Sequence, residues 1–379
     1  MIKIWLGPRE SDILTMGKYF DKSITFYGSD GQDNYSYCTE HRRNLYYDDN
    51  YYKFVFDSFD KLLAMDSECA VHFYSGGHAN RLKEMRPEYA QHFKYINDPM
   101  LLDWFNNKTY SRTWMENSVD VPRYKLLSKS ECAYGALSEK FYGFDEFILQ
   151  LNHSSGGKGT WKLNKQNEIK LFDEIPGNEP LLVSPYYADT ISANCHIIVG
   201  ENESILFPTS VQIINVQNDK MIYSGGDYTY GRSVDEQMGD KLYDFKSKMA
   251  GMLSKTGYRG VCGIDFLVYG EKILLIEINP RYQGSTFVLN HELTNCGYPS
   301  ITELTTWAFD NPEFLAEWKD RIEKIKIKNE GHVISLSPDA TLEDAYRLFD
   351  DVKDKHNVFL DGFLNAKEFE SSPYLFKYF

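Results

Sequence analysis

The residues of this chain most suited to chemistry lie within residues 263–286. The segment reads as two short apolar strands joined by a tight turn, and each strand carries one carboxylate, Asp265 on the first and Glu277 on the second. Antiparallel pairing would bring these carboxylates opposite each other, and strand alternation puts Asn279 on the face of Glu277. Two carboxylates and an amide oxygen form an all-oxygen site that suits Mg²⁺ bridging phosphates. Arg281, two residues further on, would hold a phosphate or a carboxylate through two parallel hydrogen bonds.

A solvated hairpin face is the alternative interpretation of this segment. Acidic residues at strand ends are common, and two adjacent carboxylates repel each other unless a cation lies between them. Pairing by itself supports both interpretations about equally. The strand around Glu277 is otherwise apolar, which favours a buried site whose charge is balanced by a cation.

A glycine-rich loop, HSSGGKGTW at residues 153–161, is the second chemical feature. Its glycines let the backbone point N–H groups at an anion, and its lysine and hydroxyl groups add donors. A plain flexible turn is the alternative, and the loop is not a P-loop because a strand rather than a helix follows it. The candidate phosphate-binding residues are Ser155, Gly156, Gly157, Lys158, Gly159 and Thr160.

Strands and helices that would position these groups are readable along the chain. Alternation of strands and helices over residues 1–97 predicts a small parallel sheet. Further strands are expected at 146–152, 160–164, 179–187, 191–200 and 205–216, before the carboxylate hairpin. Helices are expected at 53–65, 78–92, 99–118, 234–256 and 301–324, and a strand and a short helix near the end of the chain.

Composition excludes several classes of protein. The 379 residues are 42% apolar and 25% charged, with a net charge of −14 and no basic block, which argues against nucleic acid or an anionic membrane as a partner. Six scattered cysteines without a C-x-x-C pair indicate neither a zinc site nor a disulfide framework. The sequence shows no signal peptide and no apolar run of 18 residues, so we expect a soluble, cytoplasmic protein.

The segment E-I-N-P-R, with an acidic residue twelve positions before its glutamate, resembles the metal-binding end of the ATP-grasp superfamily. Those enzymes activate a carboxylate with ATP and join it to an amine, or less often to a thiol. The resemblance implies Asp265, Glu277 and Asn279 as ligands of Mg²⁺, with Mn²⁺ as an alternative ion. It implies Arg281 as the residue that steadies an acyl phosphate, and the glycine-rich loop as part of a lid over the ATP phosphates.

The fold implied by the resemblance combines α/β and α+β units in several domains. A small parallel-sheet α/β domain at 1–97 would precede an ATP-grasp domain at 98–324. A mobile lid would span about 122–183, and a short α/β extension would follow at 325–379.

The nucleotide site implied by the resemblance departs from the family at two positions. Lys108 stands where a family lysine contacts the phosphates, although a solvated helix lysine is the alternative. A second family lysine is replaced by Gln150, which supplies no charge, and an acidic residue that often holds the ribose is replaced by Ser184. The implied nucleotide contacts are Lys108, Gln150, Ser184, the backbone of Tyr186 and Tyr187, and Gln212.

The reacting end would contain Arg281, Asn194 and Gln283. Strand alternation over 191–199 puts Asn194 and His196 on a polar face, and Asn194 falls where many members carry a glutamate. Gln283 would face the acceptor pocket. A structural role is the favoured interpretation of His196.

We expect an ADP-forming ligase that joins a carboxylate, of an amino acid or a peptide-like acid, to an amine. The acceptor would alternatively be the thiol of a carrier protein, or the chain would be a nucleotide-binding module without activity. A dinucleotide-dependent enzyme is disfavoured because no G-x-G-x-x-G follows the first strand. A homodimer is compatible with the sequence, which does not select an oligomeric state.

Overall fold

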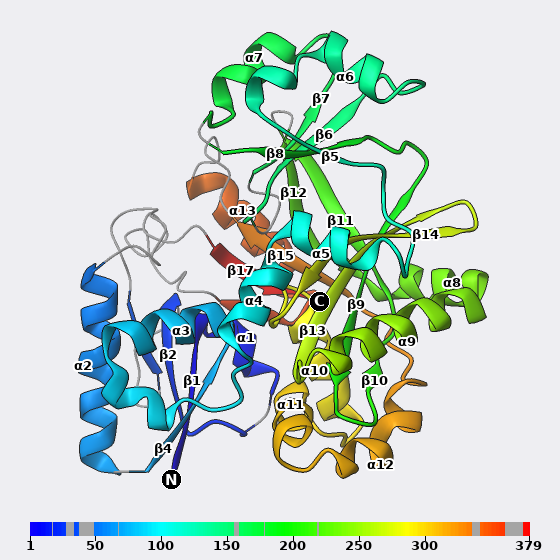
Figure 1. Ribbon diagram of the computed structural model, residues 1–379. Coiled ribbons are helices and arrows are strands. Elements are labelled where there is room, and N and C mark those ends of the chain that lie inside the picture. The colour runs from blue at the N-terminus through cyan, green and yellow to red at the C-terminus, as the bar shows by residue number, and fades with distance from the viewer. Residues whose placement is uncertain are drawn as a thin grey trace.

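The computed structural model of the chain contains two β-sheets with helices packed around them (Figure 1). The smaller sheet has the order β3-β2-β1-β4, and the larger one joins the remaining strands of the described residues. In the described part of the chain, no helix is both long and apolar enough to cross a membrane. The structure describes residues 1–16, 18–27, 34–37, 49–66, 68–154, 159–177, 179–217, 220–335, 342–360 and 374–379.

The N-terminal unit is a parallel sheet covered by helices, as the alternation of strands and helices predicts. Its apolar side chains, among them Ile4, Val55 and Leu82, form one buried cluster. The strands are β1 (Ile2–Arg9), β2 (Lys22–Tyr27), β3 (Asn34–Ser36) and β4 (Cys69–Phe73), and the helices are α1 (Ser11–Leu14), α2 (Asp49–Met65), α3 (Gly76–Met85) and the 3-10 helix Pro87–His92.

The single helix expected at 99–118 is wrong, because the chain forms two helices, α4 (Pro99–Asn106) and α5 (Lys108–Met115). Asn107 lies between them with an extended backbone, and its side-chain oxygen accepts a hydrogen bond from the backbone N–H of Tyr110. This N-cap satisfies one of the free N–H groups at the start of α5, so a second helix begins there.

Residues 125–185 form a unit with a core of its own, at the top of Figure 1. Four antiparallel strands in the order β7-β6-β8-β5 pack against two helices. Phe147, Leu149 and Val183 alternate inward from their strands, as period-two patterning requires. The elements are β5 (Lys125–Leu127), a 3-10 turn (Lys129–Glu131), α6 (Tyr134–Lys140), β6 (Phe147–Leu151), β7 (Thr160–Leu163), α7 (Glu168–Glu174) and β8 (Leu181–Pro185).

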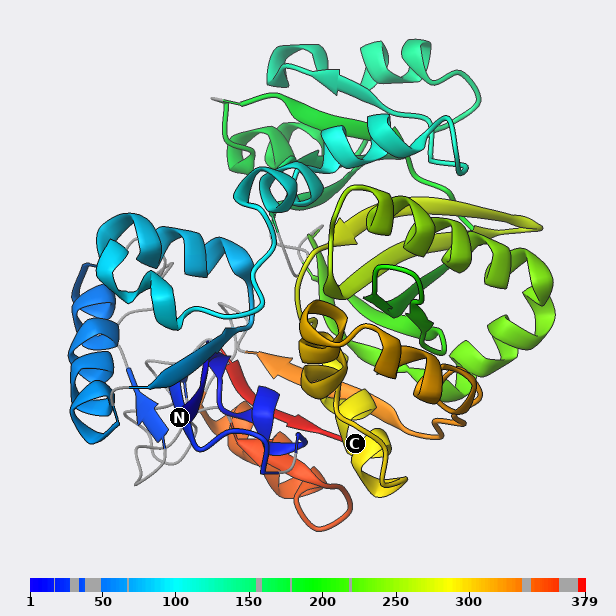
Figure 2. The same cartoon turned by 60° about the horizontal axis from the view of Figure 1, so that its bottom comes forward.

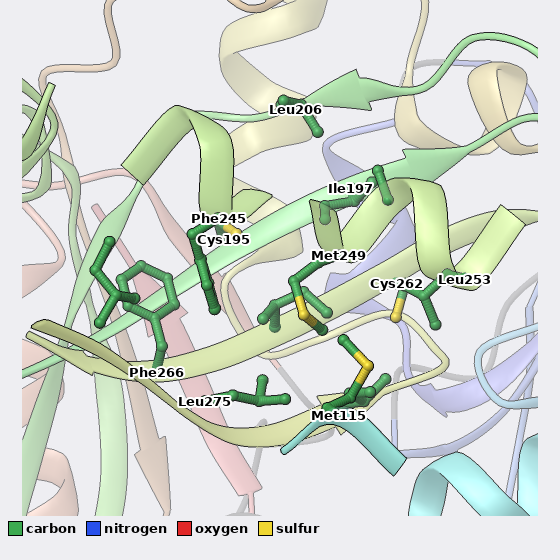
Figure 3. Close-up of a cluster of buried hydrophobic side chains, with 14 of the residues drawn as sticks. Met115, Cys195, Ile197, Leu206, Phe245, Met249, Leu253, Cys262, Phe266 and Leu275 are labelled. Atoms are coloured by element: carbon green, nitrogen blue, oxygen red, sulfur yellow. The ribbon is translucent and has the colours of Figure 1, made fainter. Parts of the chain in front are cut away.

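The central part of the large sheet is antiparallel and packs one face on a long helix. Cys195, Ile197 and Phe266 project from that face onto Phe245 and Met249 (Figure 3). Fully burying such a side chain stabilises a fold by about 1.5–3 kcal/mol as an upper estimate. The strands are β9 (Ile191–Val199), β10 (Ile205–Leu206), β11 (Ser210–Gln217), β12 (Lys220–Asp227), β13 (Gly260–Tyr269) and β14 (Lys272–Asn279).

The helices expected at 234–256 and 301–324 are both interrupted in the structure. Gly239 has a φ of +52°, a left-handed value that ends the first helix of one pair. Asn311 and Pro312 separate the second pair. The resulting helices are α8 (Tyr228–Met238), α9 (Asp240–Lys255), α11 (Ile301–Asp310) and α12 (Glu313–Ile322).

The C-terminal segment adds strands to the large sheet. β15 pairs with β12 and with β17, and a buried ion pair between Lys377 and Asp12 ties β17 to the N-terminal unit. Helix α10, which the sequence analysis did not anticipate, follows the carboxylate hairpin directly. The elements are α10 (Thr286–Asn295), β15 (Glu330–Ser335), α13 (Leu342–Val352), β16 (Val358–Leu360) and β17 (Tyr374–Tyr378).

Candidate active site

The β13–β14 hairpin brings the two carboxylates together. Asp265 lies directly opposite Glu277, which confirms the expected pairing, and a bulge follows immediately, at Ile276. Asn279 lies on the same side of the hairpin, where its side-chain nitrogen donates to Oδ2 of Asp265 at 3.2 Å. Asn279 is buried, whereas both carboxylates are partly exposed, so these groups line an opening rather than a closed core.

Lys108 lies against this hairpin rather than in solvent. Its Nζ is 3.2 Å from a carboxylate oxygen of Glu277 and donates to the backbone oxygen of Ser154 at 2.7 Å. Only 3% of the Lys108 side chain is exposed. The lysine therefore stands between the carboxylate hairpin and the start of the glycine-rich loop. A solvated helix lysine, the alternative interpretation, is wrong.

Asp265 is surrounded by amide side chains. Asn194 donates to its Oδ1 at 2.5 Å, and Gln283 donates to the same oxygen at 3.3 Å. Asn194 also donates to Gln283 at 2.9 Å. Gly263 makes this close approach feasible, since a Cβ there would lie 1.9 Å from the Gln283 side chain.

The electrostatics of Asp265 fit a site that binds a cation. Burial, and then repulsion from Glu277, raises its pKa to about 6. Nearby, Oδ1 of Asn194 is buried without a hydrogen-bond partner among the described residues, so an acceptor is left over beside a carboxylate. The described residues contain no group of three or more His, Cys, Asp or Glu side chains suited to a metal. A metal here would rely on two carboxylates, amide oxygens and phosphates, the hard oxygen ligands that suit Mg²⁺.

Arg281 connects the hairpin to the N-terminal unit. Its Nη2 donates to the Asn279 side-chain oxygen at 2.9 Å, and Nη1 donates to the backbone oxygen of Tyr282 at 3.0 Å. Arg281 forms an isolated β-bridge with Ser75, and its guanidinium lies 6.0 Å from the centre of the Tyr74 ring. Tyr74 and Ser75 follow β4 at the carboxyl edge of the small sheet, the edge where parallel sheets present ligand sites.

The other residues expected to bind the nucleotide lie in three places: on the β5–β8 unit, in the segment that follows β8, and on β11. Gln150 on β6 pairs with Thr160 on β7, and Gly159 has a φ of +83°. Ser184 is buried on β8, and the backbone of Tyr186 donates to Glu146. The Tyr187 hydroxyl accepts from Arg123 N–H at 3.1 Å, and Gln212 accepts from Ser192 at 2.7 Å. Ser155, Gly156, Gly157 and Lys158 lie outside the described residues.

Two parts of this region were missed by the sequence analysis. One is the Tyr74–Ser75 segment, for which the glycine pair Gly76-Gly77 that follows it was the available signal. The other is Arg112 on α5, which is buried beside Gln150. The signal for it was spacing, because Lys108, Ser111, Arg112 and Met115 follow the i, i+3, i+4, i+7 pattern of one helix face.

The comparison with protein families gives a match over residues 105–285 to the ATP-grasp domain. No curated protein matches the sequence of the chain.

Solved structures resemble the whole chain at low identity. An N5-carboxyaminoimidazole ribonucleotide synthetase with bound ADP has a TM-score of 0.66 at 13% identity, covering 100% of this chain and 91% of that one. The synthase from Aspergillus clavatus with ATP has a TM-score of 0.62 at 15% identity, covering 99% and 93%. The biotin carboxylase domain of the 2-oxoglutarate carboxylase from Hydrogenobacter thermophilus, with MgADP and bicarbonate, has a TM-score of 0.64 at 12% identity, covering 100% and 86%.

These similarities agree with the geometry. The matched residues 105–285 contain α5, the β5–β8 unit and the carboxylate hairpin, and the solved structures share the fold from the small N-terminal sheet onward. The chain therefore carries an ATP-grasp domain, over residues 105–285, behind a small parallel-sheet unit.

Proposed function

We propose that this protein is an ADP-forming ligase that uses ATP to activate a carboxylate and joins it to an amine. The observation that supports this proposal most strongly is that Asp265 faces Glu277 and that Nζ of Lys108 lies 3.2 Å from a carboxylate oxygen of Glu277. Transfer of a phosphoryl group from ATP requires cationic groups and a metal ion that offset the charge of the phosphates. Lys108 would supply the first and the two carboxylates would hold the second. The crystallised neighbours that contain ADP, ATP or MgADP support ATP and Mg²⁺ as the cofactors.

Three domains of the chain would contribute different parts of the site. Residues 1–97 would contribute the Tyr74–Ser75 edge, 98–324 the nucleotide and metal residues, and 325–379 a C-terminal extension. The separate core of the β5–β8 unit supports its assignment, over about 122–183, as a lid. Water must be kept from an acyl phosphate, and closure of a lid would serve that purpose.

The groups that hold a metal would be Asp265, Glu277 and Asn279. Bound Mg²⁺ would offset the negative charge of the phosphates. Lys108 is already placed between Glu277 and Ser154, so it would move its contact from the carboxylate to a phosphate. Asn194 and Gln283 hold Asp265 by hydrogen bonds and fix its orientation.

The reaction would proceed in two steps. An oxygen of the substrate carboxylate attacks the γ-phosphorus of ATP, the bond to the β,γ-bridging oxygen breaks, and ADP leaves. The amine then attacks the acyl carbon, phosphate leaves, and the amine proton departs with it. Arg281 would bind the carboxylate first and the developing oxyanion afterwards, because its planar group donates two parallel hydrogen bonds.

The substrates would be small molecules, with an amino acid or a peptide-like acid as the carboxylate. Arg281, Asn279 and the Tyr74 ring together offer a cation, an amide and an aromatic surface. This set suits a carboxylate attached to a compact polar body.

The test is ADP release by the purified protein with ATP and Mg²⁺. Carboxylates, led by amino acids, are supplied singly and in pairs with amines, and products are identified by mass spectrometry. We expect ADP and phosphate in equal amounts only with an effective pair, together with an amide-bonded product. Release of AMP, or no nucleotide binding by calorimetry, would contradict the proposal.

A further inference from the structure

Arg112 is a buried cation that the proposed reaction has not used. The residue is 1% exposed. Its Nε donates to the backbone oxygen of Ile276 at 2.9 Å, and its Nη2 donates to the side-chain oxygen of Gln150 at 2.9 Å. Nη1 is buried without a partner among the residues that the structure describes.

The partners of Arg112 do not neutralise it. Both are uncharged oxygens. Arg112 forms no salt bridge among the described residues, and the nearby carboxylate of Glu277 is paired with Lys108. Burial lowers the pKa of Arg112 to about 10, against the attraction of Glu277. A guanidinium nevertheless stays charged at neutral pH, and a buried charge that no salt bridge neutralises, with a spare donor, is costly. An anion bound beside it would remove that cost.

The position of Arg112 indicates which anion would fit. Helix α5 lies between the β5–β8 unit and β14 (Figures 1 and 2). Lys108 and Arg112 are one turn apart on its buried face, about 6 Å along the axis. Lys108 reaches Glu277 and Ser154 at the loop end, whereas Arg112 reaches Gln150 on β6. Two cations one helical turn apart, with Lys108 at the glycine-rich loop and Arg112 farther from it beside Gln150, match two successive phosphates of a nucleotide.

We propose that Nη1 of Arg112 donates a hydrogen bond to the phosphate nearest the nucleoside, the α-phosphate, of the bound nucleotide. This inference rests on the proposed function, because it requires a nucleotide between α5 and the β5–β8 unit. Gln150 on β6 is uncharged and accepts a hydrogen bond from Nη2 of Arg112. The positive charge beside the proposed phosphate therefore comes from Arg112 on α5 and not from the strand. Arg112 thus becomes a nucleotide-binding residue of this chain.

The test measures the affinity of adenosine, AMP and ADP by calorimetry without Mg²⁺, so that metal ligation does not contribute. In Arg112→Met we expect AMP and ADP to bind about 10- to 100-fold more weakly, the size expected for one hydrogen bond between charged groups. Adenosine, which has no phosphate, should keep its affinity within about twofold. Arg112→Lys, which retains the charge, should lose less AMP affinity than Arg112→Met. Arg321→Met on α12 removes an exposed arginine and serves as the matched control.

The outcomes separate this inference from the function on which it rests. Normal AMP binding by Arg112→Met would overturn the role of Arg112 and leave the ligase proposal standing. Equal weakening of adenosine and AMP would overturn it too, since this indicates that Arg112 only ties α5 to β6 and β14. If Arg112→Met does not fold, Arg112→Gln decides, because it keeps hydrogen-bonding groups and removes the charge. Weaker binding of AMP than of adenosine then supports a phosphate contact, and equal changes for the two compounds refute it. Failure of the wild-type protein to bind any of the three compounds would refute the proposed function and this inference together.

Discussion

Replacement of Glu277 by glutamine tests the carboxylate hairpin most sharply. The substitution keeps the size and hydrogen-bonding capacity of the side chain and removes its charge. Two unit charges 3.2 Å apart attract by about 5 kcal/mol at an effective dielectric constant of 20. Desolvation of both groups offsets most of that attraction, and glutamine still accepts a hydrogen bond from Lys108. The net loss of folding stability should therefore be about 1–3 kcal/mol.

The effect of Glu277→Gln on catalysis should be larger than its effect on folding. One of two charged oxygen ligands disappears, so binding of Mg²⁺ with the phosphates weakens. We expect the rate of ADP release to fall at least about 100-fold, equivalent to about 2.7 kcal/mol. Rates are measured against Mg²⁺ concentration, and unfolding is followed by circular dichroism in urea.

The same hairpin offers a matched control. Glu271 lies at its turn, is exposed, and forms a surface salt bridge with Lys241 at 2.9 Å. Glu271→Gln makes the same chemical change away from the site and should leave the rate and its Mg²⁺ dependence unaltered. If Glu277→Gln keeps more than about a tenth of the wild-type rate, a loss below about 1.4 kcal/mol, the metal assignment is wrong.

Three further predictions concern separate parts of the molecule. Arg281→Lys should raise the barrier by about 2–4 kcal/mol while ATP affinity changes little; parallel loss of nucleotide binding and thermal stability would assign Arg281 a structural role. His72 is buried, and burial lowers its pKa from 6.5 to about 3. The unfolded chain therefore takes up the proton at His72 first, and this residue should lower stability by up to about 1.4 kcal/mol per pH unit as pH drops below 6.5, in addition to the contributions of the buried His78 and His196. His72→Phe should reduce that slope in urea titrations, and an unchanged slope would show that folding does not lower the pKa of His72. Gly263→Ala should displace Gln283 from Asp265 and lower turnover with an intact fold, and a normal rate would remove Gln283 from the site.

The carboxylate hairpin was predictable because its determinants are local. Alternating apolar residues and a turn glycine predict two adjacent strands with the two carboxylates roughly opposite each other. A regular ladder from this turn would place Asp265 opposite Ile276, and the bulge at Ile276 brings Glu277 opposite it instead. The polar face of β9 follows from the same period, and Asn194 accordingly reaches Asp265 while Cys195 packs in the core.

Helix boundaries were predicted less well, although their signals are present in the sequence. Asn107, Gly239 and Asn311–Pro312 each interrupt an apolar pattern that continues on both sides. Helical periodicity cannot distinguish one long helix from two consecutive ones, whereas a capping residue can.

The contacts of Arg112 and Tyr74 could not be predicted, because they join segments far apart in the chain. Arg112 reaches Ile276, 164 positions away, and Arg281 approaches Tyr74, 207 positions away. Such contacts depend on how α5 and the N-terminal unit pack against β14, and single-strand patterns do not encode that packing.

The most direct test of the proposed function follows the oxygen of the substrate carboxylate. A carboxylate–amine pair found by the ADP-release screen is supplied with ¹⁸O in the carboxylate, and the released phosphate is analysed by mass spectrometry. Formation of an acyl phosphate transfers one carboxylate oxygen to the phosphate, so we predict one ¹⁸O in each phosphate released with ADP. Unlabelled phosphate would show that water, not the carboxylate, attacks ATP, and would contradict the account.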